Sequence, residues 1–267
     1  VVDQNNENYI ANNQYVLNKS GETIILAAPN YEYGEYVLPS EYTAISDAAF
    51  SGISKITAIT LNNSVSLGQY AFANCTNLTN AKIGENTISN YAFYGDSKLK
   101  TVDFENINSI GNYAFYRTNI TNLELKEGTK VGKYAFANSY ITSIKLNNNI
   151  NLDDSAFEGI SSLQSVKMPD DASITIGDSA FKNDYNLSII DLSKATGTLG
   201  SYAFYGCSSI KNAILTNVTS IGNYAFAGCL RLQALEIPSV TSIGDYAFAQ
   251  DPKKTDLGTP QISSVVI

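Results

Sequence analysis

The chain has 267 residues, of which 44% are hydrophobic, and it carries a net charge of −8. This length and hydrophobicity predict a folded polypeptide with one large domain or two ordinary ones. The acidic balance, with no cluster of basic residues, argues against nucleic acid and anionic membranes as partners. No apolar run is long enough to insert into a bilayer and cross it, so we expect no membrane insertion by this segment.

The residue inventory excludes several kinds of active site. There is no histidine, which excludes a Ser-His-Asp triad and any zinc site that needs imidazole. Cys75, Cys207 and Cys229 are odd in number and far apart, so neither a disulfide framework nor a shared metal ion is expected. We therefore expect no cofactor, no metal and no enzymatic activity. Polarity that comes mainly from Asn, Ser, Thr and Tyr is typical of exported bacterial proteins.

An Ala-Phe pair recurs along most of the chain. Its phenylalanines follow one another at intervals of 21 to 24 residues: Phe50, Phe72, Phe93, Phe115, Phe136, Phe157, Phe181, Phe204, Phe226 and Phe248. A period this regular over ten repeats is typical of a solenoid. One coil of this length cannot bury both of its apolar edges alone, so we expect stacked coils in which these phenylalanines form a continuous structural core.

Each repeat is predicted to contain the same elements in the same order. After the phenylalanine, a short link leads to an apolar-x-x-apolar-x-apolar run, such as residues 78–83, whose final alternation predicts a short strand with one buried face. A turn follows, and then an apolar residue with a glycine, as at Leu67-Gly68 and Ile221-Gly222. We expect this glycine to take a positive φ at a tight corner. The Ala-Phe segment after it is expected to form a single helical turn.

Some repeats depart from this pattern. The repeat between Phe157 and Phe181 is the longest, and residues 170–173 are predicted to form a bulging loop. The final repeat replaces its link with residues 251–258 and ends on a strand predicted over 262–267. A solenoid that ends on a bare strand lacks the usual polar cap. We therefore expect either a fragment of a longer protein or ends covered by end-to-end or edge contacts with another copy.

One pattern supports a family resemblance. Residues 220–238 match Ser-Ile-Gly-x-Tyr-Ala-Phe-x-Gly-Cys-x-x-Leu-x-x-Leu-x-Ile-Pro almost throughout, and this pattern resembles the BspA-like leucine-rich repeats of bacterial surface proteins. The likeness extends over about 41–267, as about ten repeats. Residues 1–40 resemble the hairpin-bearing repeat variant of that family, continuous with the solenoid, with residues 19–22 as the hairpin turn.

The resemblance implies an α/β fold with one domain overall. The expected architecture is a leucine-rich-repeat solenoid, a right-handed βα superhelix with short strands on its concave side and single helical turns.

Three groups of residues could form sites, and each also has a structural explanation. A tyrosine precedes Ala-Phe in seven repeats and could form a ladder that docks sugars or peptides, although stacking between coils is favoured. These residues are Tyr70, Tyr91, Tyr113, Tyr134, Tyr202, Tyr224 and Tyr246. The pairs Asp153-Asp154 and Asp170-Asp171 could bind calcium or act as paired carboxylates, but solvated turns are favoured. The cysteines share a slot three residues after the phenylalanine, which indicates a small buried position.

The outward row of the predicted strands is the candidate binding surface. This row consists of the residue before the last apolar position of each predicted strand. Its charged residues form alternating acidic and basic blocks. The candidate concave-face residues are Lys82, Asp103, Glu124, Lys145, Lys167, Asp191 and Glu236. Leucine-rich repeats commonly bind protein ligands with this face, and a merely soluble face is the alternative interpretation.

The family resemblance also implies a function. It predicts a non-enzymatic protein, extracellular or on the bacterial cell surface, that binds an extracellular or host protein and mediates adhesion. A rigid spacer in a larger envelope protein is the first alternative. A glycan-binding or glycan-cleaving solenoid is the second, and cleavage would need clustered Asp, Arg or Lys on successive coils. Arg117 and Arg231, however, lie several coils apart.

Overall fold

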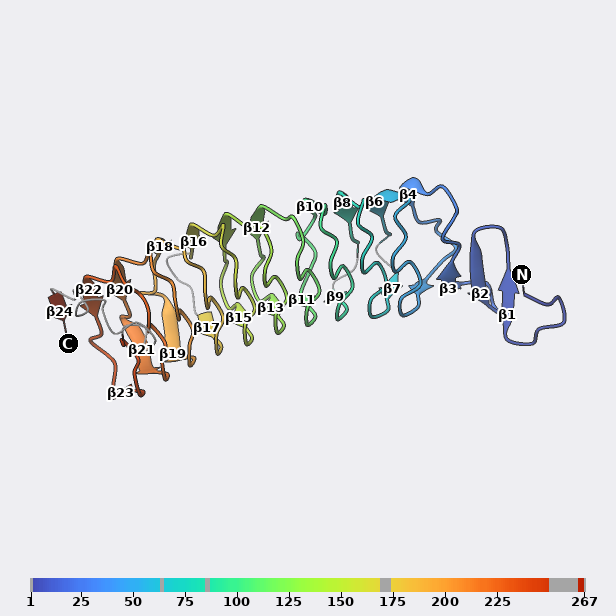
Figure 1. The fold of residues 1–267 in the computed structure, drawn as a ribbon. Helices are drawn as coiled ribbons and strands as arrows, with labels where there is room; N and C mark the ends of the chain where they lie inside the picture. The colour runs from blue at the N-terminus through green and yellow to red at the C-terminus, as the bar shows by residue number, and fades with distance from the viewer. Residues whose placement is uncertain (1, 63–64, 85–86, 169–173, 250–263, 267) are drawn as a thin grey trace. The chain divides into compact units, whose positions relative to one another are not determined.

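The computed structural model describes residues 2–62, 65–84, 87–168, 174–249 and 264–266 (Figure 1). Every regular element in these ranges is a β-strand, and the described part of the chain contains no helix that could cross a membrane. The chain divides into two compact units, residues 1–120 and residues 121–267. We call them the N-terminal unit and the C-terminal unit.

The N-terminal unit begins with a hairpin and continues as stacked coils. Strands β2 and β3 pair antiparallel on either side of residues 19–22, and β1 extends this sheet, whereas the later strands pair in parallel. The strands form the orders β1-β2-β3-β5-β7 and β10-β8-β6-β4, together with the pair β9-β11. Their bounds are β1 Tyr9–Ala11, β2 Tyr15–Asn18, β3 Thr23–Ala27, β4 Gly34–Val37, β5 Ala44–Ile45, β6 Ile56–Thr60, β7 Ser66–Leu67, β8 Asn80–Lys82, β9 Thr87–Ile88, β10 Thr101–Val102 and β11 Ser109–Ile110.

The C-terminal unit has two rows of parallel strands, with one strand of each row in most coils. The first row contains the ladders β12-β14-β16-β18 and β20-β22-β24, and the second contains β13, β15, β17, β19, β21 and β23. Their bounds are β12 Asn122–Glu124, β13 Lys130–Val131, β14 Ser143–Lys145, β15 Asn151–Leu152, β16 Ser165–Lys167, β17 Ile174–Ile176, β18 Ile189–Ile190, β19 Ala195–Leu199, β20 Asn212–Ile214, β21 Asn217–Ile221, β22 Ala234–Glu236, β23 Ser242–Ile243 and β24 Ser264–Val266.

We call the strands that follow the phenylalanine link, together with β4, which pairs with the first of them, strand row A. They are β4, β6, β8 and β10 in the N-terminal unit, and β12, β14, β16, β18, β20, β22 and β24 in the C-terminal unit. Buried and exposed residues alternate along these strands, as expected for a strand with one face in the core. In β12, for example, Leu123 is buried while Asn122 and Glu124 are exposed. The alternation directs one face of row A to solvent.

The predicted helical turn at Ala-Phe is wrong. Tyr202 has a φ of 58°, which a right-handed helix does not accommodate. Alternate N–H groups here donate to the next coil: Tyr202 N to Asn223 O at 2.8 Å, Phe204 N to Ala225 O at 2.7 Å, and Gly206 N to Ala227 O at 2.8 Å. These donors are therefore unavailable for a helix within the coil. The described chain is a β-solenoid of stacked coils, and the expected α/β superhelix with helical turns is not supported.

The expected positive φ at the corner glycine is also wrong. Gly68 and Gly222 do not have a positive φ; the tyrosine two residues later does. A Cβ at Gly222 would lie 2.5 Å from Ser201 N in the preceding coil, and one at Gly68 would lie 2.3 Å from Asp47 N. Glycine is therefore needed because the backbones of neighbouring coils approach closely here.

The core of both units is a row of stacked phenylalanine rings. The nine residues from Phe50 to Phe226 in this row are at most 1% exposed, and Phe248 is half-buried. Within each unit, neighbouring ring centroids lie 5.0 to 5.6 Å apart. Each ring therefore buries its faces against the coils before and after it, which couples the stability of one coil to its neighbours.

Buried tyrosines close the N-terminal end of this row. The rings of Tyr15, Tyr33 and Tyr36 pack around Phe50, with centroid distances of 6.1, 5.7 and 5.7 Å. The hydroxyls of Tyr15 and Tyr36 are hydrogen-bonded to each other, and burial raises the pKa of Tyr33 to about 12. This cluster covers the aromatic core where the stack of coils begins.

Candidate functional site

All seven candidate binding residues are exposed on strand row A. Lys82 ends β8, and Asp103 directly follows the paired strand β10 in the N-terminal unit. In the C-terminal unit Glu124, Lys145 and Lys167 stand opposite one another in register on β12, β14 and β16. Asp191 follows β18, and Glu236 ends β22, where it stands opposite Ile214. The structure thus brings these residues together on row A within each unit.

The ion pairs on this surface are exposed. Lys145 pairs with Glu124 on the preceding coil, and both side chains are more than half exposed. Solvent and salt screen such a pair strongly, so its contribution to stability is small. Among the described residues, no carboxylate lies within ion-pairing distance of Lys167. Row A therefore offers both signs of charge to a partner.

An apolar patch, formed by Ile189 and Ile214 and not predicted as a site from the sequence, interrupts these polar residues. Ile189 on β18 is 65% exposed, and Ile214 on β20, in the next coil, is 38% exposed. Other coils of the C-terminal unit place Asn122, Ser143 and Ser165 at the position of Ile189. Ile214 stands at a strand position that is charged in the neighbouring coils. An apolar residue at a position that is charged in most coils of the C-terminal unit was the available sequence signal, and Val266 on β24, 50% exposed, is a second apolar residue at the position of Ile214.

The backbone of row A is also interrupted at this patch. Parallel ladders join β16 to β18 and β20 to β22, but in the described part of the chain no ladder joins β18 to β20. The second strand of the same two coils remains paired, since β19 pairs with β21. The two exposed isoleucines thus lie on neighbouring coils where the row A sheet is broken.

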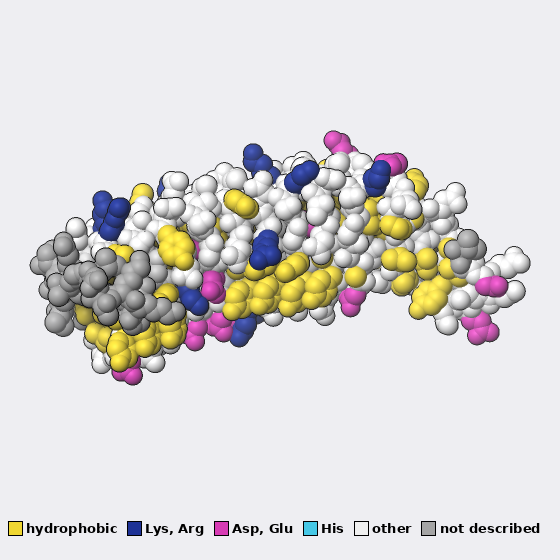
Figure 2. Space-filling view, viewed as in Figure 1, with side chains coloured by type: hydrophobic (Ala, Val, Ile, Leu, Met, Phe, Trp, Pro, Cys, Tyr) yellow, Lys and Arg dark blue, Asp and Glu magenta, His cyan; other side chains and the backbone are white. Residues whose placement is uncertain are grey.

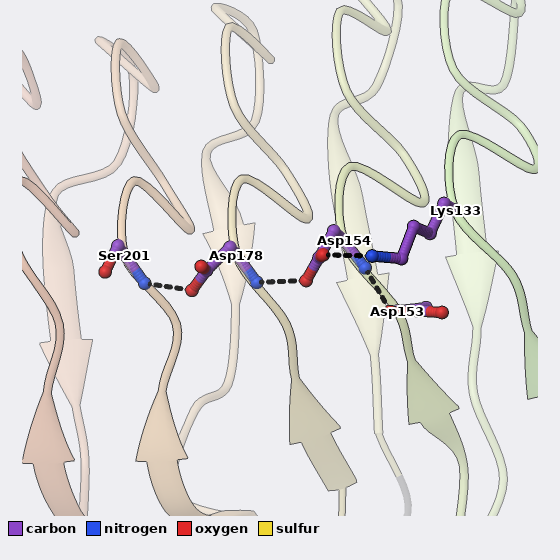
Figure 3. A network of polar contacts seen from close by, with 5 residues as sticks. All are labelled: Lys133, Asp153, Asp154, Asp178 and Ser201. Atoms are coloured by element: carbon purple, nitrogen blue, oxygen red, sulfur yellow. Dashed lines mark hydrogen bonds and ion pairs between the residues drawn. The ribbon is translucent and has the colours of Figure 1, made fainter.

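A polar network in the C-terminal unit uses the acidic pair Asp153-Asp154 (Figure 3). Asp154 accepts a hydrogen bond from Lys133 Nζ at 2.8 Å and from the backbone N of Asp178 at 3.2 Å. Asp178 in turn accepts the backbone N–H of Ser201 at 2.6 Å. The Asp154 carboxylate raises the pKa of Lys133.

Two hydrogen bonds of this network go to backbone N–H groups of the following coils. No group of three or more Cys, Asp or Glu residues within the described ranges is placed to hold a metal ion. The second acidic pair, Asp170-Asp171, lies outside the described residues.

The same hydrogen bond recurs in the N-terminal unit. Asp47 accepts the backbone N–H of Gln69 at 2.7 Å, and Asn90 accepts that of Asn112 at 2.7 Å. An Asn or Asp directly after the corner region therefore satisfies a donor of the following coil. The repeated Asn or Asp before the tyrosine was a visible signal of this role.

The tyrosines of the Tyr-Ala-Phe segments stack on one another. Ring centroids of Tyr70, Tyr91 and Tyr113 are 4.4 and 5.0 Å apart, and those of Tyr202, Tyr224 and Tyr246 are 4.9 and 5.0 Å apart. Figure 2 shows hydrophobic side chains, tyrosine included, in runs along the surface. Within a ladder each inner ring has both faces covered by its neighbours, so mainly the ring edges face solvent. Ser155 and Ser179 hold the equivalent position between Tyr134 and Tyr202.

The slot three residues after the phenylalanine holds cysteine in three coils, and Ile, Thr, Ser or Asp in others. The Sγ atoms of Cys75, Cys207 and Cys229 donate to a phenylalanine carbonyl of the preceding coil at 3.2, 3.0 and 3.3 Å. Burial raises the pKa of all three thiols, which argues against nucleophilic chemistry. Asp96 and Asp184 hold the same slot and are buried. The sequence alone did not single out these two residues.

Comparisons with known proteins agree with this architecture. The family model described as a BspA type leucine-rich repeat region matches residues 30–131 and 129–254, in six copies. A solved leucine-rich repeat protein from Bacteroides ovatus ATCC 8483 is 21% identical, covers 100% of this chain and 82% of its own, and has a TM-score of 0.58. At this identity the likeness shows the fold.

Two further solved structures have lower TM-scores. A leucine-rich repeat protein from T. pallidum is 21% identical over 82% of this chain and 87% of its own, with a TM-score of 0.49. A leucine-rich cell surface protein from Faecalibacterium prausnitzii A2-165 is 22% identical over 97% of this chain and 85% of its own, with a TM-score of 0.41. No curated protein matches. The family model covers most residues of this chain. The chain therefore belongs to the BspA-type leucine-rich repeat family.

Proposed function

We propose that this chain is a non-enzymatic binding protein, secreted or displayed on a bacterial surface, and that strand row A of its C-terminal unit contacts an extracellular or host protein. The observation that carries the proposal is the exposed pair Ile189 and Ile214. Apolar side chains at the centre of a contact, surrounded by polar residues, supply most of the affinity of many protein interfaces.

The surroundings of the patch fit such a contact. Lys145 and Lys167 lie on the preceding coils of row A, Asp191 lies on the same coil as Ile189, and Glu236 lies on the coil after Ile214. Mixed charges around an apolar centre favour one orientation of a partner and disfavour wrong partners. The stacked phenylalanine core beneath row A holds the surface in place, so little order has to be gained on binding.

The two alternative functions have less support. A rigid spacer requires stacked coils, but it gives no reason for isoleucine in place of serine and lysine at two exposed positions. A glycan-cleaving solenoid requires carboxylates directed at a substrate. Asp154 and Asp178 instead accept backbone N–H groups of the following coils (Figure 3).

The test compares binding by the wild type and a matched variant, Ile189→Ser with Ile214→Lys. Ser165 and Lys167 hold the same positions in a preceding coil, so both replacements suit the repeat. The control is Val37→Thr, which changes an exposed residue of β4 to the residue opposite it, Thr60. Each protein is titrated on purified extracellular-matrix proteins and host cell-surface proteins, and Kd is measured by biolayer interferometry.

We expect the wild type and Val37→Thr to bind the same target with equal Kd. The double variant should bind at least about tenfold more weakly, or about 1.4 kcal/mol, with an unchanged circular dichroism spectrum. Equal binding by the double variant, or no binding by any of the three proteins across the panel, would count against the proposal.

A further inference from the structure

Two aspartic acids are buried between coils, one in each unit. Asp96 and Asp184 are both 0% exposed. One oxygen of each, Oδ1, accepts a backbone N–H from the same slot of the preceding coil. Cys75 N donates to Asp96 at 2.8 Å, and Ile160 N donates to Asp184 at 2.7 Å. The other oxygen, Oδ2, has no hydrogen-bond partner among the described residues.

The groups that face Asp96 do not compensate a negative charge. The Cys75 thiol lies beside it and donates its own hydrogen bond to Phe50 O at 3.2 Å. In the next coil, Thr118 Oγ1 holds the same slot and donates to Phe115 O at 2.9 Å. No Lys or Arg of the described ranges forms an ion pair with this carboxyl group.

Asp184 has similar surroundings. The Cys207 thiol lies near it and donates to Phe181 O at 3.0 Å. Glu158 is the other titratable neighbour of Asp184. Lys182 forms its ion pair with Glu158, at 3.3 Å, and not with Asp184. A carboxylate here would be out of water with one hydrogen bond to one oxygen, which is a costly arrangement.

We infer that Asp96 and Asp184 are un-ionised in the folded protein, and that each joins its coil to the preceding coil as a neutral carboxylic acid, so that ionisation loosens the junction. Burial raises the pKa of both groups well above that of an exposed aspartate. The N–H of Cys75 opposes this shift at Asp96, and the N–H groups of Ile160 and nearby Gly159 oppose it at Asp184. Glu158 adds to it at Asp184.

The sign of the pH dependence follows from linkage. The pKa of each group is higher in the folded state than in the unfolded state, so the folded protein binds more protons between those two values. The stabilisation is complete below the unfolded pKa, near 4, and is lost as the pH rises towards the folded value. Each carboxyl group then increases the unfolding constant by up to about tenfold per pH unit.

The experiment uses Asp96→Asn and Asp184→Asn, singly and together. An amide keeps an oxygen that accepts the N–H of Cys75 or Ile160, but it does not titrate. The control is Asp103→Asn with Asp191→Asn, which removes two exposed carboxyl groups of row A. Unfolding by urea is followed from about pH 4 to about pH 8 for all variants. Infrared difference spectra report protonated carboxyl groups in the folded wild type.

We expect the wild type and the control to lose stability as the pH rises over this range. The double Asn variant should lose markedly less. Each single variant should remove part of the effect. The wild type should show a protonated carboxyl band at neutral pH that the double variant lacks.

A double variant with the same slope as the wild type would overturn the inference. So would the absence of a protonated carboxyl band from the wild type at neutral pH. The infrared result on the wild type decides the matter if the double variant does not fold.

Discussion

The Asp178 carboxylate accepts the backbone N–H of Ser201 in the following coil at 2.6 Å, and the N–H of Asp178 is itself bound by Asp154 at 3.2 Å (Figure 3). A side chain of one coil thus satisfies a main-chain donor of the next. The same relationship holds between Asp47 and Gln69 in the N-terminal unit. Coils are therefore joined by side-chain acceptors as well as by strand ladders.

We predict that Asp178→Ala destabilises the protein by about 0.5–1.5 kcal/mol, because the N–H of Ser201 loses its acceptor. Asp178→Asn keeps an amide oxygen at the same position and should remain close to the wild type. Urea denaturation of both variants measures the difference. An Asn variant as unstable as the Ala variant would show that the charge matters, and not the acceptor.

Phe157→Ala should cost much more stability. Phe157 is 0% exposed, and its ring is stacked between Phe136 and Phe181 with both centroid distances at 5.4 Å. Its removal leaves a cavity that the rings of two neighbouring coils cannot close, so we expect a loss of about 3–5 kcal/mol.

The matched control for this change is Tyr140→Ala. Tyr140 is 59% exposed, so its truncation should change the free energy of unfolding by less than about 0.5 kcal/mol. Thermal or urea denaturation compares the two variants. Similar losses from both would contradict a core made of stacked phenylalanines.

Two glycine variants separate close approach from backbone conformation. In Gly222→Ala the new Cβ would lie 2.5 Å from Ser201 N and 2.7 Å from Gly200 C, so coils must move apart. Gly197 has a φ of 70° and open space around it, so Gly197→Ala should cost only about 1–2 kcal/mol of left-handed strain. We expect Gly222→Ala to be the less stable protein by circular dichroism melting. If Gly197→Ala were the less stable variant, glycine would be needed for its φ and not for the close approach of the coils.

The three thiols should resist alkylation in the folded protein. Burial raises the pKa of Cys75, Cys207 and Cys229, and each Sγ is hydrogen-bonded to a carbonyl. The thiolate is the reactive form, so iodoacetamide at neutral pH should modify the native protein slowly and the urea-unfolded protein at all three sites. Mass spectrometry counts the modified residues. Rapid labelling of the native protein would show that the coils open readily around this slot.

The sequence by itself determined the period of the chain and the residues of its core. An Ala-Phe pair every 21 to 24 residues can be buried only by stacking, and alternation within each strand separates Leu123 from Glu124 without any structure. It also determined which face of row A meets solvent. These features depend on local patterns that repeat, so a single chain displays them many times over.

Only the tertiary structure decided how the coils are joined. A helical turn at Tyr202-Ala203-Phe204 is locally reasonable, but Phe204 N donates to Ala225 O one coil later, and that contact spans 21 residues. The close approach at Gly222 and the burial of Asp96 likewise depend on a neighbouring coil. The same backbone N–H groups are available as donors in a helical turn and in a stack of coils. The neighbouring coil decides which carbonyl accepts each N–H, and a local sequence pattern does not contain that information.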